Sequence, residues 1–125
     1  QSAVQLAYAY IQLEQLAKAQ SIIDGFTHFL EESKTKKSND PSYYYNMALV
    51  SALKNDKTAT YQYIQGAIDA GWIRVWQADL EPILAQVAQE HQFTQMMGGI
   101  KARLINMRAR EEGESSFLLA DRETF

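Results

Sequence analysis

The sequence predicts an all-α fold, a right-handed stack of antiparallel helix hairpins with about six helices. Apolar residues recur three and four positions apart through most of the chain, which is the spacing of one helix face. Residue types that cap helices stand before several of these runs, and the first two hairpins superpose with a shift of 41 residues. The composition, 46% apolar and 22% charged, is that of an ordinary globular domain.

The first hairpin is expected at about residues 2–32 of a helical domain that covers residues 1–112. Ser2 can cap its first helix, because a serine oxygen accepts from the free amides of the first turn. The inner stripe of that helix is predicted to be Ala3, Leu6, Ala7 and Tyr10. A second helix, at about 15–32, follows within one or two residues, so the two should be antiparallel neighbours. The polar residues 33–40 are interpreted as a solvated linker rather than as a cationic patch for an anionic partner.

The second hairpin is expected at about residues 41–70, and the rest of the chain is organised around it. Asp40 is a strong cap candidate, and Pro41 suits the first helical position, where no amide is needed. A turn at Asn55 ends the first helix of this hairpin, and Asp56 can cap the second. Gly71 can take the left-handed conformation that commonly follows a helix.

Three consecutive tyrosines open the second hairpin. Successive helical residues point about 100° apart, so Tyr43, Tyr44 and Tyr45 cannot all enter one core. If Tyr44 lies inside with Met47 and Ala48, Tyr45 is left on or near the surface.

A pair of capping helices is expected at about residues 80–110. In the connection before them, Trp72 and Trp76 are expected to fill the core beneath the capping helices. The second capping helix, at about 92–110, shows an inner face of Phe93, Met97, Ile100, Leu104 and Met107. Gly98 and Gly99 together lower the stability of this helix by about 2 kcal/mol relative to alanine. Their presence predicts close packing against another helix or a kink. Four cations suit the negative end of its dipole: Lys101, Arg103, Arg108 and Arg110.

The two hairpins are alike in residue size and spacing. The 41-residue shift places Ala3, Leu6, Ala7, Tyr10, Ala19, Ile23 and Phe26 on Tyr44, Met47, Ala48, Ser51, Thr60, Ile64 and Ala67. This pattern resembles the tetratricopeptide repeat, in which small residues let helices approach and large ones fill the gap to the next unit. Residues 71–100 resemble the closing segment after the last repeat of many bacterial regulators. The chain starts without methionine, and a piece of a longer helical array is expected rather than a chain with a removed leader.

The resemblance implies a concave groove lined by the first helices of successive hairpins. Matched position by position, the groove residues are Tyr8, Gln12, Tyr45, Asn46 and Leu49, with Val4, Ile11, Ala52 and Leu53 beside them. Tyrosine suits such a place because it offers a large contact area and a polar tip at low entropic cost. The implied partner is a protein or a peptide. A terminal-carboxylate ligand is not expected, because Asn46 alone matches the polar positions that it needs.

Several function classes are not expected from the composition. The net charge of −3 lacks the basic excess of a nucleic-acid binder. The absence of cysteine excludes disulfides and thiolate catalysis, and His28 and His91 lie far apart, so neither a metal site nor a cofactor is indicated. No catalytic constellation stands out, and a non-enzymatic protein is expected. No apolar run is long enough for a membrane span, so a cytoplasmic location is expected, or a periplasmic one if the parent protein is membrane-anchored.

The function expected is that of a scaffold or regulatory module of a larger bacterial protein, with a peptide or helix bound in the groove. One alternative is homodimerisation of a transcription regulator or cyclase through the last helix and the tail at 113–125. Within that tail, Phe117, Leu118 and Leu119 are the candidate self-association residues. The other alternative is a small-ligand sensor with a pocket near Trp72 and Trp76.

Overall fold

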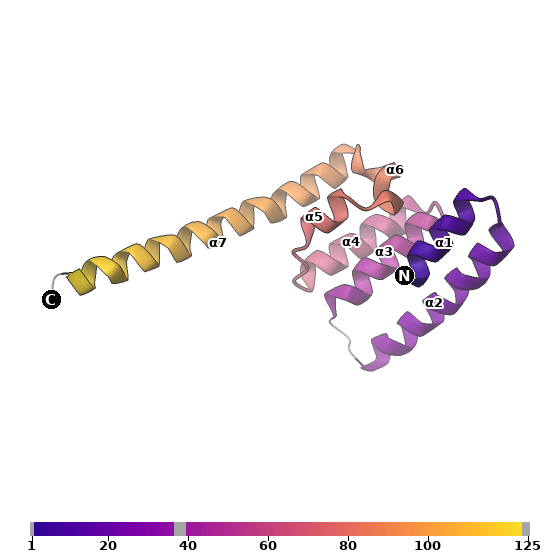
Figure 1. Cartoon of the computed structure of the whole chain (residues 1–125), viewed down its shortest axis with the longest axis horizontal. Helices are drawn as coiled ribbons and strands as arrows, with labels where there is room; N and C mark the ends of the chain where they lie inside the picture. The colour runs from indigo at the N-terminus through magenta and orange to yellow at the C-terminus, as the bar shows by residue number, and fades with distance from the viewer. Residues whose placement is uncertain (1, 37–39, 124–125) are drawn as a thin grey trace.

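Helix α3 (Pro41–Leu53) lies at the centre of the computed structural model, which describes residues 2–36 and 40–123, with side chains at 2–33 and 40–113. Helices pack against it on both sides (Figure 1). Seven of its side chains are buried: Tyr43, Tyr45, Met47, Ala48, Leu49, Val50 and Ser51. A helix buried nearly all round is a central helix. The prediction that the chain is organised around this hairpin is therefore confirmed.

The described residues form helices and no strand, which confirms the all-α prediction. Helix α1 (Ala3–Gln12) packs along α2 (Leu16–Lys36), and α3 packs along α4 (Lys57–Asp69), as two antiparallel hairpins (Figure 1). The closing segment contains α5 (Val75–Asp79), the 3₁₀ turn η1 (Pro82–Leu84), α6 (Ala85–Ala88) and α7 (His91–Glu123). The expectation of about six helices agrees with this order, and the handedness of the stack remains a prediction.

The three predicted N-terminal caps are confirmed. The side chain of Ser2 accepts from the amide of Gln5, and Asp40 accepts from Ser42 at 2.9 Å. Asp56 accepts from the amide of Ala59 at 3.1 Å. These bonds satisfy amides that have no partner within the first turn of a helix.

Helices α1, α3 and α4 end in the same way. A residue in the left-handed conformation follows each, namely Glu14 (φ 59°), Asn55 (φ 60°) and Gly71 (φ 101°). At each end the next amide reaches back five residues, as in Gln15 N to Tyr10 O at 2.9 Å. The turns at Glu14 and Asn55 are 41 residues apart, so the shift that matches the two sequences also matches their turns.

The core forms two clusters that share α3. One lies between α1, α2 and α3 and contains Ala7, Ile23, Leu30, Tyr43, Met47 and Val50. The other joins α1, α3 and α4 to the closing segment, from Val4 through Trp72 to Phe93 and Ile100. The pairs matched by the shift, Ala7 with Ala48 and Ile23 with Ile64, are buried, whereas Leu6 is 38% exposed against 6% for its counterpart Met47.

The predictions for the tyrosines and for Val4 are wrong in part. Tyr44 is only half-buried, and Tyr45, expected on or near the surface, is 6% exposed. Because α3 has core on two sides, Tyr43 joins one cluster and Tyr45 the other. Val4 of α1, expected beside the groove, is buried in the second cluster, which also contains Tyr45 and Trp72.

The connection after Gly71 contains the five-residue helix α5. Trp72 is buried as predicted, but Trp76 is 63% exposed and does not fill the core. The first of the two predicted capping helices is divided into η1 and α6. Pro82 occupies the first turn of η1, where a proline is tolerated.

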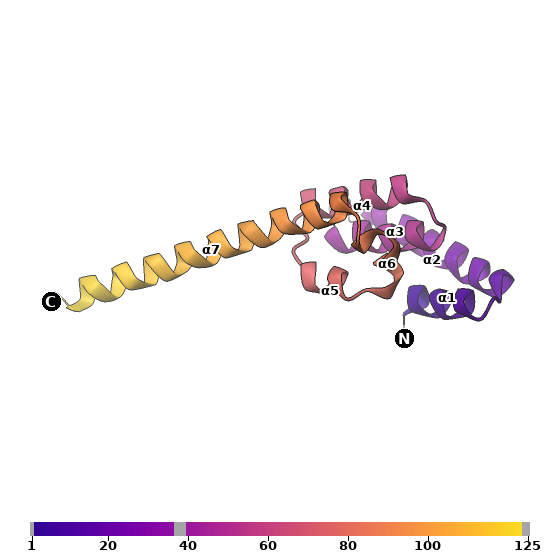
Figure 2. The same cartoon turned by 90° about the horizontal axis from the view of Figure 1, so that it is seen from above.

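Helix α7 is longer than predicted, with 33 residues. Its first turns pack on the body, and its C-terminal part extends away from the other helices (Figures 1 and 2). Phe93, Met97 and Ile100 are buried as predicted, but Met107 is 57% exposed because the helix has left the body there. The four cations are not at the helix end, so the dipole explanation for them is wrong. A Cβ on Gly98 or Gly99 would meet nothing within 4 Å, so no close packing occurs there.

Residues 113–123 of the predicted tail continue α7 rather than forming a separate element. Phe117, Leu118 and Leu119 lie at positions of this helix whose side chains are outside the described part of the chain. In the part that is described, no helix is both long and apolar enough to cross a bilayer.

Candidate functional site

A cleft with a volume of about 400 Å³ opens between the start of α1, the first half of α3 and the segment around α5. We call it the α1–α3–α5 cleft. Its walls combine amide, charged and apolar side chains from three separated parts of the sequence: Ser2, Val4, Gln5, Pro41, Ser42, Tyr45, Asn46, Leu49, Gly71, Trp72, Ile73, Arg74, Gln77 and Glu81. A hollow of this size is within the range of ordinary ligand sites.

One wall of the cleft is a pair of stacked rings. The rings of Tyr45 and Trp72 lie with centroids 5.0 Å apart and planes 15° apart, and each residue is 6% exposed. Large buried rings in contact hold their elements firmly, here α3 and the segment after α4. The wall is therefore rigid and prepared in advance of any ligand.

The hydroxyl of Tyr45 is buried and has no hydrogen-bond partner among the described residues. Burial, and secondly the negative charge of Glu81, raise the pKa of Tyr45 well above its ordinary value. The group is thus neutral under all ordinary conditions. A buried hydroxyl without a partner is uncommon and costs stability.

The opposite wall is fixed by a bond between distant parts of the chain. The side-chain amide of Gln5 on α1 donates to Glu81 Oε1, just before η1, at 2.6 Å. Arg74 is exposed and forms no ion pair within the described residues. The cleft therefore presents the hydrogen-bonded carboxylate of Glu81 and the unpaired guanidinium of Arg74, so it can bind ligand groups of either charge.

Of the five groove residues predicted from the sequence, three line this cleft: Tyr45, Asn46 and Leu49. Tyr8 is instead half-buried and packs against the second core cluster. Gln12 is exposed at the last residue of α1, and neither Tyr8 nor Gln12 lines the cleft. The expected neighbours Ile11, Ala52 and Leu53 likewise lie outside it.

Sequence reasoning missed the residues that the closing segment contributes, chiefly Arg74, Gln77 and Glu81. The spacing of Arg74 and Gln77, three residues apart, could have placed them on one helical face. However, α5 has only five residues and no capping side chain, so its presence was not evident. Nothing in the sequence around Glu81 indicates its place in the cleft, because its partner Gln5 is 76 residues away.

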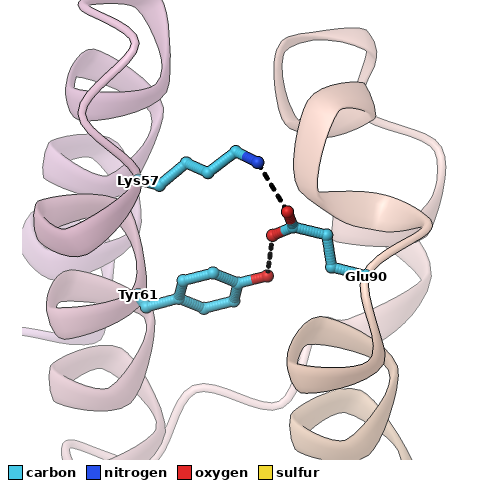
Figure 3. A network of polar contacts seen from close by, with 3 residues as sticks. All are labelled: Lys57, Tyr61 and Glu90. Carbon is cyan, nitrogen blue, oxygen red and sulfur yellow. Dashed lines mark hydrogen bonds and ion pairs between the residues drawn. The ribbon is translucent and has the colours of Figure 1, made fainter.

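A second polar site joins α4 to the start of α7 (Figure 3). Lys57 Nζ lies 2.6 Å from Glu90 Oε2, and the hydroxyl of Tyr61 donates to Glu90 Oε1 at 2.6 Å. The bonds from Lys57 and Tyr61 lower the pKa of Glu90. Burial, and then the bond to Glu90, raise the pKa of Tyr61 to about 12. All three side chains have partners, so this network links α4 to the start of α7.

Among the described residues, no group of three or more histidine and carboxylate side chains could hold a metal ion. The two polar sites therefore differ in character. The Glu90 network is satisfied within the protein, whereas the α1–α3–α5 cleft leaves Arg74 and the hydroxyl of Tyr45 without partners in the described structure. The cleft is the better candidate for binding. Comparison of the chain with protein-family models, with curated proteins and with solved structures finds no match.

Proposed function

We propose that the chain is a protein-interaction module that holds a short peptide segment in the α1–α3–α5 cleft. The observation that supports this most is the convergence of Tyr45, Asn46 and Leu49 on one hollow with Arg74 and Glu81. These residues come from α3 and from the closing segment, two parts of the chain that only the packing of the fold brings together.

The chemistry of the walls favours a peptide over an apolar small molecule. Asn46 and Gln77 have amide side chains, and each amide can both donate to a carbonyl and accept from an N–H of a peptide backbone. Ile73 is 53% exposed and offers an apolar surface at the rim. The stacked rings of Tyr45 and Trp72 give a fixed surface, which lowers the ordering cost of binding.

We also propose that the fold is a repeat array of the tetratricopeptide type, with two hairpins and a closing segment. Matched residues are buried in equivalent places, such as Ala19 at 2% and Thr60 at 0% exposure. The turns at Glu14 and Asn55 share one backbone conformation at the same 41-residue interval. In such arrays the first helices of the hairpins present the binding surface, which agrees with a cleft on α1 and α3.

A peptide library displayed on phage, panned against the immobilised chain, tests the proposal. Selected peptides are synthesised, and their Kd values are measured by calorimetry. Asn46→Arg fills the cleft with a long side chain and should weaken binding at least about tenfold, because interface contacts at a central site dominate affinity. Gln12→Arg adds the same charge on α1 outside the cleft and should leave the Kd unchanged.

Thermal melting establishes that both variants remain folded. Should Asn46→Arg melt early, Gln77→Arg takes its place, because Gln77 is an exposed residue of the same cleft. Failure to select any peptide, or an equal effect of the cleft variant and Gln12→Arg, would contradict peptide binding at this site.

A further inference from the structure

Beyond Leu104, the described side chains of α7 do not pack against the rest of the chain. The helix contacts α4, α5 and α6 through its first turns, and Leu104 is the last half-buried residue among its described side chains. From 105 to 113 every side chain is exposed, with Ile105 at 67% and Met107 at 57%. The helical backbone nevertheless continues to Glu123, well clear of the other helices (Figures 1 and 2).

A single helix surrounded by water is only marginally stable, because most helical stability in proteins comes from packing of an apolar face. Large exposed side chains such as Ile105 and Met107 add to the expectation that something covers this part of α7. The distribution of charge along α7 indicates what packs against it.

The charges along α7 change sign near its middle. Residues 101–110 contain four cations and no anion, and residues 111–123 contain five anions and one cation. Lys101 is paired with Asp79 of α5 at 2.8 Å, which leaves three arginines for an outside partner. The bond from Arg108 to Glu112 within the helix is 3.2 Å long and highly exposed, so it contributes little.

We propose that α7 pairs with α7 of a second copy of this chain, antiparallel, with the two-fold axis near Glu111. In that register the arginines at 103–110 of each copy lie along the acidic segment 111–123 of the other. A parallel pair would set the basic halves against each other and the acidic halves against each other, which is unfavourable. The interface is self-complementary, as a two-fold dimer requires.

The orientation can be measured directly because the chain has no cysteine. Single spin labels are placed at Ala102→Cys and Ala109→Cys, both at exposed positions of α7. The antiparallel dimer places the two labels at 109 roughly 10–15 Å apart and those at 102 roughly 30 Å apart, from the helix rise and the usual interhelical distance. A parallel pair would give short distances at both sites and would overturn the proposed orientation.

Charge reversal tests the register. The double variant R108E/R110E should raise the dimer dissociation constant at least about tenfold in analytical ultracentrifugation, because like charges then face each other. Adding E112R/E114R to it should restore the dimer. The control K18E/K54E changes the net charge equally at exposed lysines of the hairpins and should leave the dissociation constant unchanged.

Circular dichroism checks that α7 stays helical in each variant. A chain that sediments as a monomer up to about millimolar concentration, where even weak pairs form, overturns the proposal. So does a dimer that the quadruple variant fails to restore. Peptide binding in the cleft is independent of this test, because no residue of α7 lines the α1–α3–α5 cleft.

Discussion

Tyr45 of α3 and Trp72, two residues after α4 and its cap, stack with ring centroids 5.0 Å apart and join the second hairpin to the closing segment. The pair belongs to the core and also forms one wall of the α1–α3–α5 cleft. The cleft therefore depends on the same contact that docks the closing segment. Disturbing this pair should affect stability and binding together, whereas changes at Asn46 should affect binding alone.

Removal of the Tyr45 hydroxyl should not destabilise the protein. Tyr45→Phe keeps the stacked ring and eliminates a buried hydroxyl that has no partner among the described residues. The free energy of unfolding should stay equal or rise by about 1 kcal/mol, because an unmade buried hydrogen bond costs that much or more. Urea denaturation followed by far-UV circular dichroism measures it. A loss above 1 kcal/mol would mean that the hydroxyl is hydrogen-bonded in solution.

The Tyr61–Glu90 bond predicts a loss of stability at high pH. Burial, and secondly the bond to Glu90, raise the folded pKa of Tyr61 from 10.0 to about 12. The stability that the protonated hydroxyl contributes is therefore complete below about pH 10 and is lost as the pH rises toward 12. Tyr61→Phe should remove this part of the dependence. The measurement is the free energy of unfolding at several pH values between 8 and about 12, and identical slopes for the two proteins would contradict the prediction.

The same network predicts a change of stability in acid, with the opposite sign. The pKa of Glu90 is lowered in the folded protein, so its contribution is present at neutral pH and is lost as the pH falls through the lowered pKa. Glu90→Gln should lower the melting temperature at pH 7. In acid, the melting temperatures of the variant and of the original protein should lie closer together. A Glu90→Gln protein that melts at the same temperature at pH 7 would show that the carboxylate contributes nothing.

Gly98 and Gly66 have different surroundings, and an alanine substitution at each position tests this difference. A Cβ on Gly98 meets open space, so Gly98→Ala should stabilise α7 by about 1 kcal/mol through helix propensity. A Cβ on Gly66 would lie 2.8 Å from Cδ1 of Tyr44, so Gly66→Ala should destabilise by about 1–3 kcal/mol despite the same propensity gain. Melting temperatures of the two variants decide this. Equal shifts in one direction would contradict the packing of α4 on α3.

The left-handed residues after α1 and α3 predict stabilising substitutions. Glu14 has a φ of 59°, where a side chain costs about 1 kcal/mol and glycine does not. Glu14→Gly should therefore raise the melting temperature by a few degrees, and Asn55→Gly should raise it less, because asparagine tolerates this conformation better. A destabilised Glu14→Gly protein would mean that the turn has another conformation.

The hairpins were predictable because their signals are local. Caps at Asp40 and Asp56, a stop at Gly71 and apolar spacing need only neighbouring residues. The burial of Tyr45 was not predictable in this way, because α3 packs against core on two sides and no single inner face describes it. Half of the cleft was missed for a similar reason, since Glu81 is positioned by Gln5 from the far end of the chain.

The extent of α7 was underestimated because the apolar spacing that predicted this helix ends at Met107. Gly98 and Gly99 lie on an exposed side of the helix, where they lower its stability without breaking it. The change of charge sign at 110–111 is visible in the sequence, but it becomes informative only once the helix is known to continue past it.

A titration of ¹⁵N-labelled protein with a selected peptide, followed by NMR, decides whether the α1–α3–α5 cleft is the binding site. The largest shifts should occur at the side-chain amides of Asn46 and Gln77 and at the indole N–H of Trp72, while Gln12 and the exposed Trp76 stay unchanged. Shifts confined to α2 or α7, with the signals of Asn46 and Trp72 unmoved, would contradict binding in the cleft.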